Sequence, residues 1–547
     1  MSQAITSVAN PFSAAILRLH PQALGIAACI AVPIIMGLLA VSLGQDANWD
    51  LRNYHWYNAH AALTGRTAID LAPAHTPTYF NPLLDILFYT AAQAFSAKVL
   101  IFLLGVIHGL NFIPLYLTAT VLLPERAAQY RGGILAAIAA VGLLGGGHLG
   151  LVGTTFFDNV VCLPILFGLW RLLRLARSVT SGIDGHRIEL LELFAMGVLV
   201  GLGVGLKLPA ATFGLGFCAA LVAIDGSLRQ RVVRTVVGGL GALAGVGVTG
   251  GWWMAHLYST TGNPLFPLFN HIFRSPMALP DAYRDTQFVP GSLIDALTFP
   301  FLVSFTPRIA GEIEFTDFRI VALVVVGIAT ATLVVMRRMP SPLTDTRALK
   351  CVAVFLVVSY LAWLNVFAIY RYVVAIEMLA PVVTIACLSL WPLPKRLGVV
   401  AGIGVLGLLM VTTRAGDWGR VPWAEQFVEV ERPALGGDTS AMVLLTGYTP
   451  TAWVVSAFPD SVPFVRIQGF SYGPEDGDVG LAGIARRRVE DHHGPFLLLS
   501  DRHELAGADQ TLARFGLVAD LKGCEPMRSN LNNDIRLCPV VRGKETP

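Results

Sequence analysis

The stretch Gln45–Tyr57, which reads QDANWDLRNYHWY, brings together residue types that could do chemistry. It follows the apolar run Leu24–Gly44 without a spacer and contains two carboxylates, Asp46 and Asp50. A membrane helix normally ends with only one or two polar anchors, although interfacial aromatics explain some of the other side chains. An ordinary interfacial loop is therefore the alternative, and we favour a reactive first loop at the membrane surface. The stretch also contains Trp49, Arg52, Tyr54, His55, Trp56 and Tyr57.

The composition indicates which kind of protein carries this loop. The chain has 547 residues, of which 54% are hydrophobic and 14% are charged, and its mean hydropathy is +0.62. A soluble protein of this size has about 25% charged residues. The net charge is +3, and no basic cluster interleaved with aromatics suggests a nucleic-acid partner. The chain is therefore predicted to be a polytopic α-helical membrane protein whose first partner is the lipid bilayer.

The apolar runs can be oriented by requiring Lys and Arg to gather on the cytoplasmic side, which predicts about eleven transmembrane helices. The N-terminus is then cytoplasmic and the C-terminus lies outside. The predicted spans cover residues 24–44, 99–123, 134–152, 160–175, 191–205, 211–224, 236–258, 318–336, 352–369, 373–390 and 397–413.

Two outer loops follow from this arrangement, a first loop over residues 45–80 and a long loop over residues 259–316. Between the first loop and the second span lies Asn81–Phe95, which is too short to span comfortably and is interrupted by Asp85. We expect it to form an amphipathic helix in the membrane interface.

The composition changes near residue 414, which divides the chain into a membrane module, 1–413, and a C-terminal domain, 414–547. β-rich runs alternate with helix-like stretches over residues 440–547, which predicts a small α/β domain. It has no dinucleotide-binding glycine fingerprint, P-loop or G-x-S-x-G elbow, so a supporting or acceptor-gripping role is expected. Cys524 and Cys538 lie in this outer domain, where a disulfide can form and persist.

Charged side chains near membrane depth are costly and are functional by default. The candidates in this chain gather on the predicted outer side, whereas a channel or a proton-coupled transporter more often has charges in the middle of its helices. An outer site suits a substrate that is presented there on a lipid. The candidates are Asp46, Asp50, Arg52, His55, Asp158, Lys207 and Arg371.

Several of these stretches resemble a known family. DLRNYHWYNAHAALTG (Asp50–Gly65) has an acid directly after the first helix, an aromatic four places on and an alanine-rich ending that closes on Gly65. It resembles the first-loop motif of the lipid A aminoarabinose transferase and protein O-mannosyltransferase branches of the glycosyltransferase C (GT-C) superfamily. YFNPLLDILFYTAAQAF is similar to their proline-led interfacial helix. Over residues 45–380, GTTFFDN, VGLGVGLKLPA, GNPLFPLFN and IYRYVVAIEMLAP also resemble recurrent blocks of bacterial members.

The resemblance implies transfer of a sugar from a polyprenyl-phosphate carrier to a glycan, lipid or protein acceptor of the cell envelope, with inversion at the anomeric carbon. The place implied is the periplasmic face of a bacterial inner membrane. A positioned carboxylate can take the proton of the attacking hydroxyl, and the spacing of Asp50 to Tyr54 matches the family motif. Asp46 is expected to orient Asp50 or to hold a cation, with a plain helix-end acid as the alternative. The pair is not the tight acidic pair of many relatives, so no cofactor is certain and a divalent cation, Mg²⁺ or Mn²⁺, stays open.

The leaving group would be a lipid phosphate, whose developing charge needs fixed cations. Lys207 and Arg371 are the expected donors, because both lie at outer ends of spans within apolar sequence; snorkelling anchors are the alternative. Asp158 is expected to contact the acceptor or the sugar, or else to cap the helix that begins near Val160. The remaining candidate substrate-binding residues are Arg52, Tyr54, His55 and Tyr372, for which interfacial placement is the alternative.

Two rival functions follow from the same placement. An O-antigen ligase or polymerase also acts on lipid-linked sugars at the outer face, but such enzymes generally rely on arginines and a histidine in a large late outer loop. Here the acids come in the first loop. A transporter or flippase for a lipid-linked sugar would have polar residues strung through the membrane, which the predicted spans mostly lack.

Overall fold

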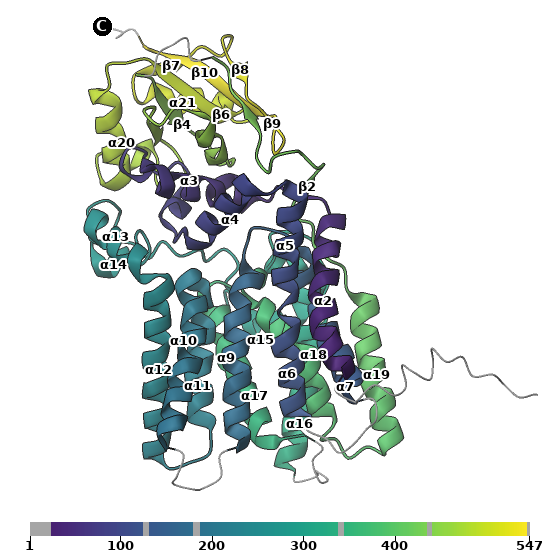
Figure 1. Cartoon of the computed structure of the whole chain (residues 1–547). Helices are drawn as coiled ribbons and strands as arrows, with labels where there is room; N and C mark the ends of the chain where they lie inside the picture. The colour runs from purple at the N-terminus through teal and green to yellow at the C-terminus, as the bar shows by residue number, and fades with distance from the viewer. Residues whose placement is uncertain (1–22, 124–130, 179–185, 337–343, 435–439, 544–547) are drawn as a thin grey trace, which may run out of the picture.

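The structure is a computed structural model that describes residues 23–123, 131–178, 186–336, 344–434 and 440–543. A bundle of apolar helices is capped by a layer from the first loop, and a small sheet domain lies on that layer (Figure 1). Within the described residues, eight helical segments are long and apolar enough to cross a membrane, so the chain is a multi-pass membrane protein. They are α2 (Ala23–Ser42), α5 (Ala97–Gly109) with α6 (Phe112–Leu122), α9 (Asp158–Ser178), α10 (His186–Leu206), α12 (Leu228–Thr249), α17 (Thr346–Val366), η7 (Tyr370–Val373) with α18 (Val374–Leu388), and α19 (Lys395–Thr412).

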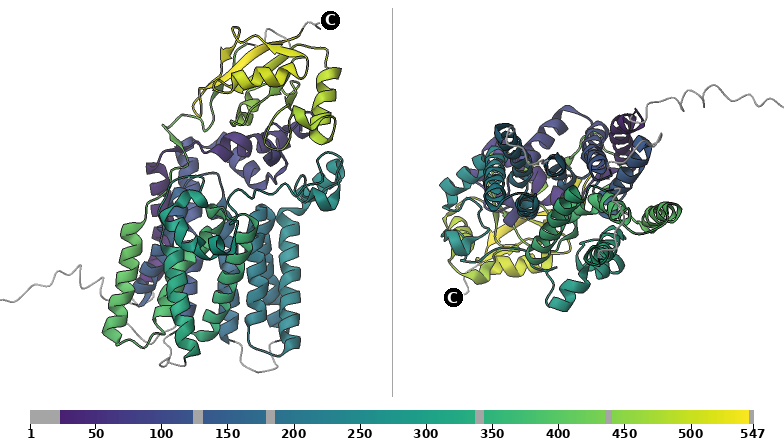
Figure 2. Two further views of the ribbon diagram at one scale, coloured as in Figure 1. Left: turned by 180° about the vertical axis from the view of Figure 1, so that it is seen from behind. Right: turned by 90° about the horizontal axis from the view of Figure 1, so that it is seen from below.

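Each of these eight segments overlaps a predicted span, although α12 begins eight residues before the span predicted over 236–258 and ends at Thr249. The other three predicted spans coincide with shorter apolar helices: α7 (Arg131–Leu143), α11 (Ala211–Ala223) and α16 (Arg319–Val335). About 20 residues are needed to cross the hydrocarbon core, so the structure confirms a polytopic helical protein while the number eleven stays a prediction. α19 is hardly buried and stands at the rim of the bundle in both further views (Figure 2).

The two predicted outer loops contain helices of their own. The first loop forms η1 (Leu51–His55), α3 (Trp56–Thr64), η2 (Arg66–Ala68) and η3 (Thr76–Tyr79), and α4 (Leu83–Ala94) follows it. α3 and α4 lie between the helix bundle and the sheet domain (Figure 1), as expected for an interfacial helix over Asn81–Phe95. The long loop and the residues before it form α13 (Gly251–Thr261), α14 (Asn270–Phe273) and α15 (Leu293–Phe305), which the sequence analysis does not anticipate.

The C-terminal domain is built on a six-stranded mixed sheet. Its central path runs β5-β4-β6-β10-β7, with β8 beside β10. β4 is parallel to β5 and β6, whereas β10 is antiparallel to its neighbours. Helices α20 (Gly480–Asp491) and α21 (Leu505–Ala513) pack on it, and Cys524 is disulfide-bonded to Cys538. The strands are β4 (Met442–Leu445), β5 (Phe464–Arg466), β6 (Phe496–Asp501), β7 (Leu517–Ala519), β8 (Glu525–Pro526) and β10 (Ile535–Arg542).

Backbone pairing ties the first loop to the C-terminal part of the chain. β1 (Gln45–Asp46) pairs antiparallel with β2 (Arg420–Val421). Leu71 forms a parallel bridge with Val465 of β5, which extends the edge of the domain sheet. A further two-stranded pairing joins β3 (Val430–Glu431) to β9 (Arg528–Ser529). The first loop is thus held from above by the sheet domain and from below by the bundle.

Candidate active site

A single turn of π-helix follows Asp50 in the first loop. Asp50 precedes this turn, Leu51–His55, which closes with a hydrogen bond from the Trp56 backbone N–H to the Leu51 carbonyl. Tyr54 Oη donates to Asp50 Oδ2 at 3.1 Å, so acid and aromatic lie on one face. π-helical turns are rare and are often found at functional sites.

Arg371 is buried at the centre of a cluster of charges where the bundle meets the first loop. Its Nη1 is 3.3 Å from Asp50 Oδ2 and 3.6 Å from Asp158 Oδ2. Its Nε donates to Glu312 Oε2 at 3.2 Å. Burial raises the pKa of the Glu312 carboxyl, and the nearby Arg371 charge opposes that rise. Three acids from three separate segments therefore share one guanidinium.

Aromatic rings and a second cation complete the cluster. The Arg371 guanidinium carbon lies 4.7 Å from the ring centroids of both Phe156 and Tyr372. Lys207 Nζ donates to Asp158 Oδ1 and to the Phe156 carbonyl, each at 2.8 Å, and lies 5.3 Å from the Tyr372 ring. Asp158 is the first residue of α9. Its carboxylate pairs with Lys207 and Arg371, so capping the helix is not its only role.

The cluster has unused hydrogen-bonding capacity. Arg371 Nη1 and Asp158 Oδ2 are both buried and have no hydrogen-bond partner in the described part of the chain. Buried polar atoms normally have partners, and an unpaired one in a folded protein needs an explanation. A bound group that accepts from Arg371 and donates to Asp158 would satisfy both atoms.

Two narrow pockets meet at Arg371. One is bounded by the charged and aromatic side chains Asp158, Lys207 and Tyr372 and by apolar side chains of α9 and α11. The other is bounded by the glycine backbone of α8 (Gly146–Gly150), by Glu312 and by Trp418. The apolar residues of the first pocket are Val161, Cys162, Pro209, Ala210 and Phe213.

His55 belongs to the same loop but has its own partner. Its Nδ1 lies 2.6 Å from Asp85 Oδ1 of α4, and both side chains are buried. Burial lowers the pKa of His55 to about 3, so the imidazole is neutral near pH 7 and one hydrogen lies between the two atoms. Its ring packs against Tyr54 and Phe157 at centroid distances of 4.0 and 5.1 Å. His55 therefore supports the face of the loop that carries Asp50.

Two candidates from the sequence lie outside the cluster. Asp46 accepts hydrogen bonds from Asn48 Nδ2 and from the backbone N–H and hydroxyl of Thr155. It therefore joins the first loop to the turn before α9 and does not contact Asp50. Arg52 is half-buried, and the acids that act on it are Asp46 and Asp501 of β6. Burial lowers the pKa of its guanidinium, which those two acids oppose.

Comparisons with known proteins give a likeness to membrane glycosyltransferases. No family model matches the chain, and neither does any curated protein. Among solved structures, the Archaeoglobus fulgidus oligosaccharyltransferase in complex with Zn and sulfate matches with a TM-score of 0.44 at 13% identity, over 87% of this chain and 68% of that one. The archaeal oligosaccharyltransferase AglB from the same organism, in complex with an inhibitory peptide and a dolichol-phosphate, matches with a TM-score of 0.43 at 12% identity, over 87% and 70%. The chain is similar in fold to these structures. At such scores the likeness carries no argument, and the site is interpreted from its own residues.

The carboxylates of the site do not form a metal-binding set. Within the described ranges, no group of three or more His, Cys, Asp or Glu side chains is arranged to hold a metal ion. Asp50, Asp158 and Glu312 instead surround the guanidinium of Arg371, which occupies the place that a cation would take. The positive charge of the site is therefore supplied by Arg371 and Lys207.

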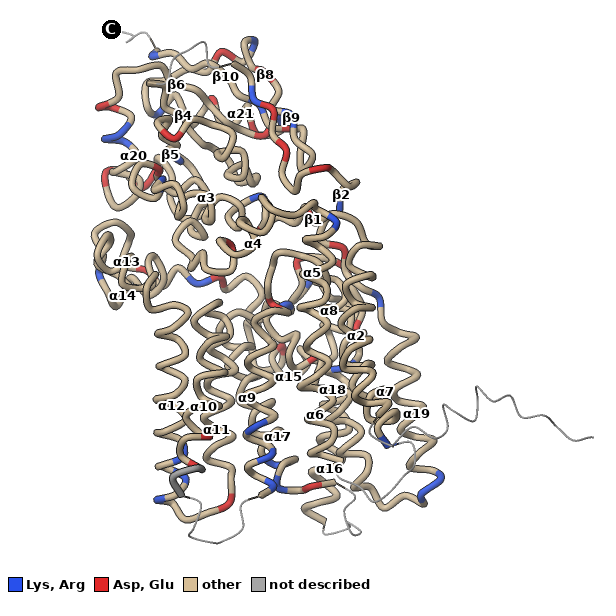
Figure 3. The backbone as a smooth tube through the Cα atoms, viewed as in Figure 1, with Lys and Arg blue, Asp and Glu red and all other residues tan. Residues whose placement is uncertain are grey.

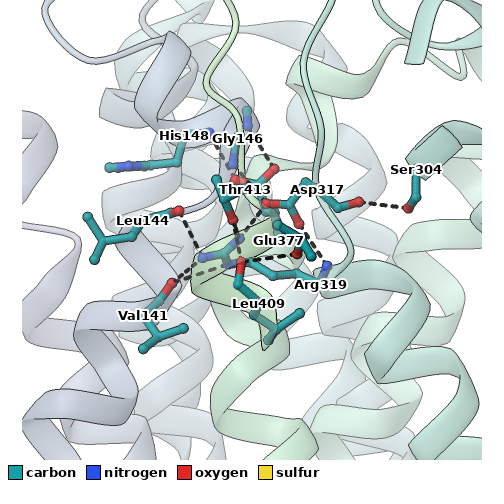
Figure 4. Close-up of polar contacts among 12 residues, drawn as sticks. Val141, Leu144, Gly146, His148, Ser304, Asp317, Arg319, Glu377, Leu409 and Thr413 are labelled. Carbon is teal, nitrogen blue, oxygen red and sulfur yellow. Dashed lines mark hydrogen bonds and ion pairs between the residues drawn. The ribbon is translucent and has the colours of Figure 1, made fainter. Parts of the chain in front are cut away.

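A second buried cluster lies below the site, where α16 and α18 begin (Figure 4). Arg319 pairs with Asp317 and donates to the carbonyls of Val141 and Leu144 and to the Thr413 hydroxyl. Glu377 accepts from the backbone N–H groups of Gly147 and His148 at 3.0 and 2.9 Å. Every guanidinium nitrogen of Arg319 is used, so this cluster holds helix ends together and leaves no free donor for a passing substrate.

The sequence reasoning missed three members of the site. Glu312 comes from the loop before α16, Asp85 from α4, and Phe156 from the turn before α9. Glu312 is two residues from Glu314, which forms an exposed pair with Arg308, and the sequence does not distinguish the two acids. Asp85 interrupts an apolar stretch, which was a usable signal for a buried functional acid.

Proposed function

We propose that this protein is an inverting membrane glycosyltransferase of the GT-C type that moves a sugar from a polyprenyl-phosphate donor to an acceptor. The observation that carries the proposal is the meeting of Asp50, Asp158 and Glu312 on Arg371, beside Lys207, at the outer end of a membrane bundle. This set provides a carboxylate for proton transfer and two cations for a leaving phosphate. In this proposal, the carboxylate and the two cations lie at the depth of the lipid headgroups.

The pocket beside Lys207 is the proposed donor pocket. Its apolar residues come from α9 and from α11 with its preceding turn, within the membrane bundle, where a polyprenyl chain dissolves. Lys207 and Arg371 lie at its polar end. Arginine binds phosphate oxygens through a planar fork, whereas lysine acts as a point charge. A phosphate there would accept from Arg371 Nη1, which lies near Asp50 and Asp158 but has no hydrogen-bond partner among the described residues.

The proposed reaction is a single displacement. The acceptor hydroxyl oxygen forms a bond to the anomeric carbon as the bond between that carbon and the phosphate oxygen breaks. The hydroxyl proton passes to Asp50, which acts as general base. The electron pair leaves with the polyprenyl phosphate, and Arg371 and Lys207 stabilise its charge. Asp158 Oδ2 is positioned to accept a hydrogen bond from a sugar hydroxyl.

The other candidate residues receive supporting roles in this proposal. Tyr54 donates to Asp50 and keeps its carboxylate directed at Arg371. The His55–Asp85 pair supports the π-turn from beneath, and Asp46 fixes the loop to Thr155. Arg52 faces the sheet domain. Neither Asp46 nor Arg52 touches the reacting atoms in the proposed mechanism.

The proposed location is the periplasmic side of a bacterial inner membrane, with an envelope glycan, lipid or protein as acceptor. Lys and Arg gather at the end of the bundle farthest from the sheet domain (Figure 3). They include Arg174 and Arg177 in α9 and Lys395 and Arg396 at the start of α19. Basic residues favour the cytoplasmic side, which supports an outward-facing site.

The test is transfer of label from a panel of radiolabelled polyprenyl-phosphate sugars to envelope acceptors by purified protein. Asp50→Asn is expected to lower turnover by about 10²- to 10⁴-fold, the usual contribution of a general base. Asp285→Asn is the matched control, because Asp285 is an exposed acid of the long outer loop. Full turnover by Asp50→Asn would remove Asp50 as the base. Specific binding of lipid-linked sugar by both proteins without any turnover would favour a transporter.

A further inference from the structure

Three exposed aromatic rings form a shelf where the first loop meets the sheet domain. We call Trp49, Tyr448 and Phe470 the aromatic shelf. Their exposed fractions are 36%, 48% and 62%, so each ring offers much of its surface to solvent. The Phe470 centroid lies 6.2 Å from that of Trp49 and 5.0 Å from that of Tyr448. Clustered exposed aromatics in a folded protein mark an interaction site more often than scattered ones do.

A buried arginine fixes the loops that carry the shelf. Arg466 is fully buried and donates to the carbonyls of Gly447 at 3.0 Å, Gln468 at 3.3 Å and Pro73 at 2.7 Å. Gly447 directly precedes Tyr448, and Gln468 lies two residues before Phe470. One guanidinium therefore sets the positions of both shelf loops and of the first-loop segment beside them.

Further polar contacts hold the individual rings. Glu504 accepts from the backbone N–H groups of Tyr448 and Thr449 at 3.0 and 3.2 Å. His75 Nδ1 accepts from the Phe470 N–H at 3.3 Å, and the His75 ring lies 4.8 Å from the Phe470 ring. The rings are thus displayed on supported loops. Such preorganisation lowers the ordering cost of binding.

The shelf continues directly into the proposed active site. Trp49 is the residue before Asp50; it contacts Phe470 of the sheet domain, whereas Asp50 contacts Arg371 of the bundle. Trp49 and Asp50 are consecutive residues, so their Cα atoms are about 3.8 Å apart and the shelf adjoins the proposed base. One extended ligand can reach both. The shelf also lies on the sheet-domain side of the first loop, away from the apolar donor pocket.

We propose that the aromatic shelf binds the carbohydrate part of the acceptor and directs its free hydroxyl to Asp50. This proposal rests on the proposed function and names the chemistry of the acceptor. Flat aromatic faces match the C–H faces of pyranose rings, and Tyr and Trp supply both apolar surface and a polar handle. Arg52 lies in the same loop with an Nε that has no hydrogen-bond partner among the described residues, so it can donate to a sugar hydroxyl. A polar donor in the same loop as Trp49 suits a hydroxylated ligand better than a lipid chain.

The proposal is tested by saturation-transfer NMR on the full-length protein in nanodiscs, with soluble oligosaccharides such as maltopentaose and chitotetraose as probes. Wild-type protein is expected to transfer saturation to pyranose ring protons. Tyr448→Ala and Phe470→Ala should each weaken binding by about tenfold. Tyr258→Ala is the matched control, because Tyr258 of α13 is 63% exposed and lies outside the shelf. Melting temperatures establish that the variants are folded.

Release of prenyl phosphate by donor hydrolysis is measured on the same proteins. It should be unchanged in Tyr448→Ala and Phe470→Ala, because neither residue touches the donor pocket. Equal sugar binding by all four proteins, or binding of peptides or vesicles with no sugar binding, would overturn the acceptor proposal. If the donor is not turned over but sugar binding still depends on the shelf residues, the proposed enzyme activity would be contradicted. The carbohydrate-binding site would then still be supported.

Discussion

Arg371 is the residue on which the proposed chemistry depends most. Its Nη1 lies near both Asp50 and Asp158 and its Nε contacts Glu312, and a lysine has one compact charge that cannot do the same. Arg371→Lys is expected to lower turnover by at least about 10²-fold, comparable with removal of one transition-state donor. Single-turnover transfer of label checks this. Arg308→Lys is the control, since the Arg308 side chain is 73% exposed. Turnover by Arg371→Lys close to that of the wild type would contradict the assignment.

The buried side chain of His75 leads us to expect that the stability of the protein depends on pH. Burial lowers its pKa well below the usual value, and the nearby Arg466 charge lowers it further. An unfolded histidine titrates at about 6.5, so below that pH the unfolded chain takes up a proton that the native side chain does not. Stability should therefore fall as pH drops below about 6.5. Melting temperatures at about pH 7 and about pH 5 measure the effect.

The variant His75→Asn separates this histidine from other titrating groups. Asn can accept from the Phe470 N–H and does not titrate. The drop in melting temperature between the two pH values should be smaller in His75→Asn than in the wild type. An identical drop in both proteins would show that His75 is not the group responsible.

At the scale of elements, one buried ion pair fastens the first loop to the sheet domain. Arg66 and Asp70 form a two-point pair with both distances at 3.0 Å, and both side chains are at most 1% exposed. Arg66 also donates to the Val462 carbonyl, and Asp70 accepts from the Phe464 N–H. Breaking a buried pair by removing one partner costs about 3–5 kcal/mol. Asp70→Asn should therefore speed hydrogen exchange of the β5 amides and loosen the domain from the loop.

The exposed pair of Arg308 and Glu314 is the control for that measurement. Surface ion pairs contribute about 0–1 kcal/mol, so Glu314→Gln should leave exchange of the β5 amides unchanged. If the β5 amides are as well protected from hydrogen exchange in Asp70→Asn as in Glu314→Gln, the Arg66–Asp70 pair does not hold the sheet domain.

The elements also explain what the sequence could and could not predict. Apolar runs of about 20 residues are a local signal, and the long helices follow them. Asp50 and Tyr54 are four residues apart, so a single helical turn suffices to place them together. Glu312 and Asp85 were missed because their roles depend on contacts with Arg371 and His55, which are distant in the sequence.

Asp46 and Arg52 show the converse case. Their types and their closeness to Asp50 make them candidates, but pairing of β1 with Arg420–Val421 sets the direction of Asp46. Nothing local in the sequence predicts that pairing. A one-residue change of register reverses the side on which a strand residue points. Two acids that are close in the sequence can therefore make different contacts. Residue type and spacing identified the loop, and tertiary contacts decided which of its members face Arg371.

At the scale of the whole molecule, the distribution of charge predicts how the protein lies in the membrane. Lys and Arg gather at the end of the bundle opposite the sheet domain (Figure 3), and this bias favours a cytoplasmic location. Single cysteines can report the sides: Thr286 in the long outer loop, Gln510 in α21 and Arg229 at the start of α12 are all exposed. The described native cysteines outside the disulfide are buried or partly buried, so they give a low background.

In intact bacterial cells, a membrane-impermeant maleimide should label Thr286→Cys and Gln510→Cys. Arg229→Cys should be labelled only after the inner membrane is permeabilised, and labelling of all three after permeabilisation is the control for reactivity. A lipid-linked donor makes sense only if Asp50 and Arg371 face the compartment without nucleotide-activated sugars. The reverse labelling pattern would place both residues on the cytoplasmic face, and it would contradict the periplasmic site while leaving the helical fold intact.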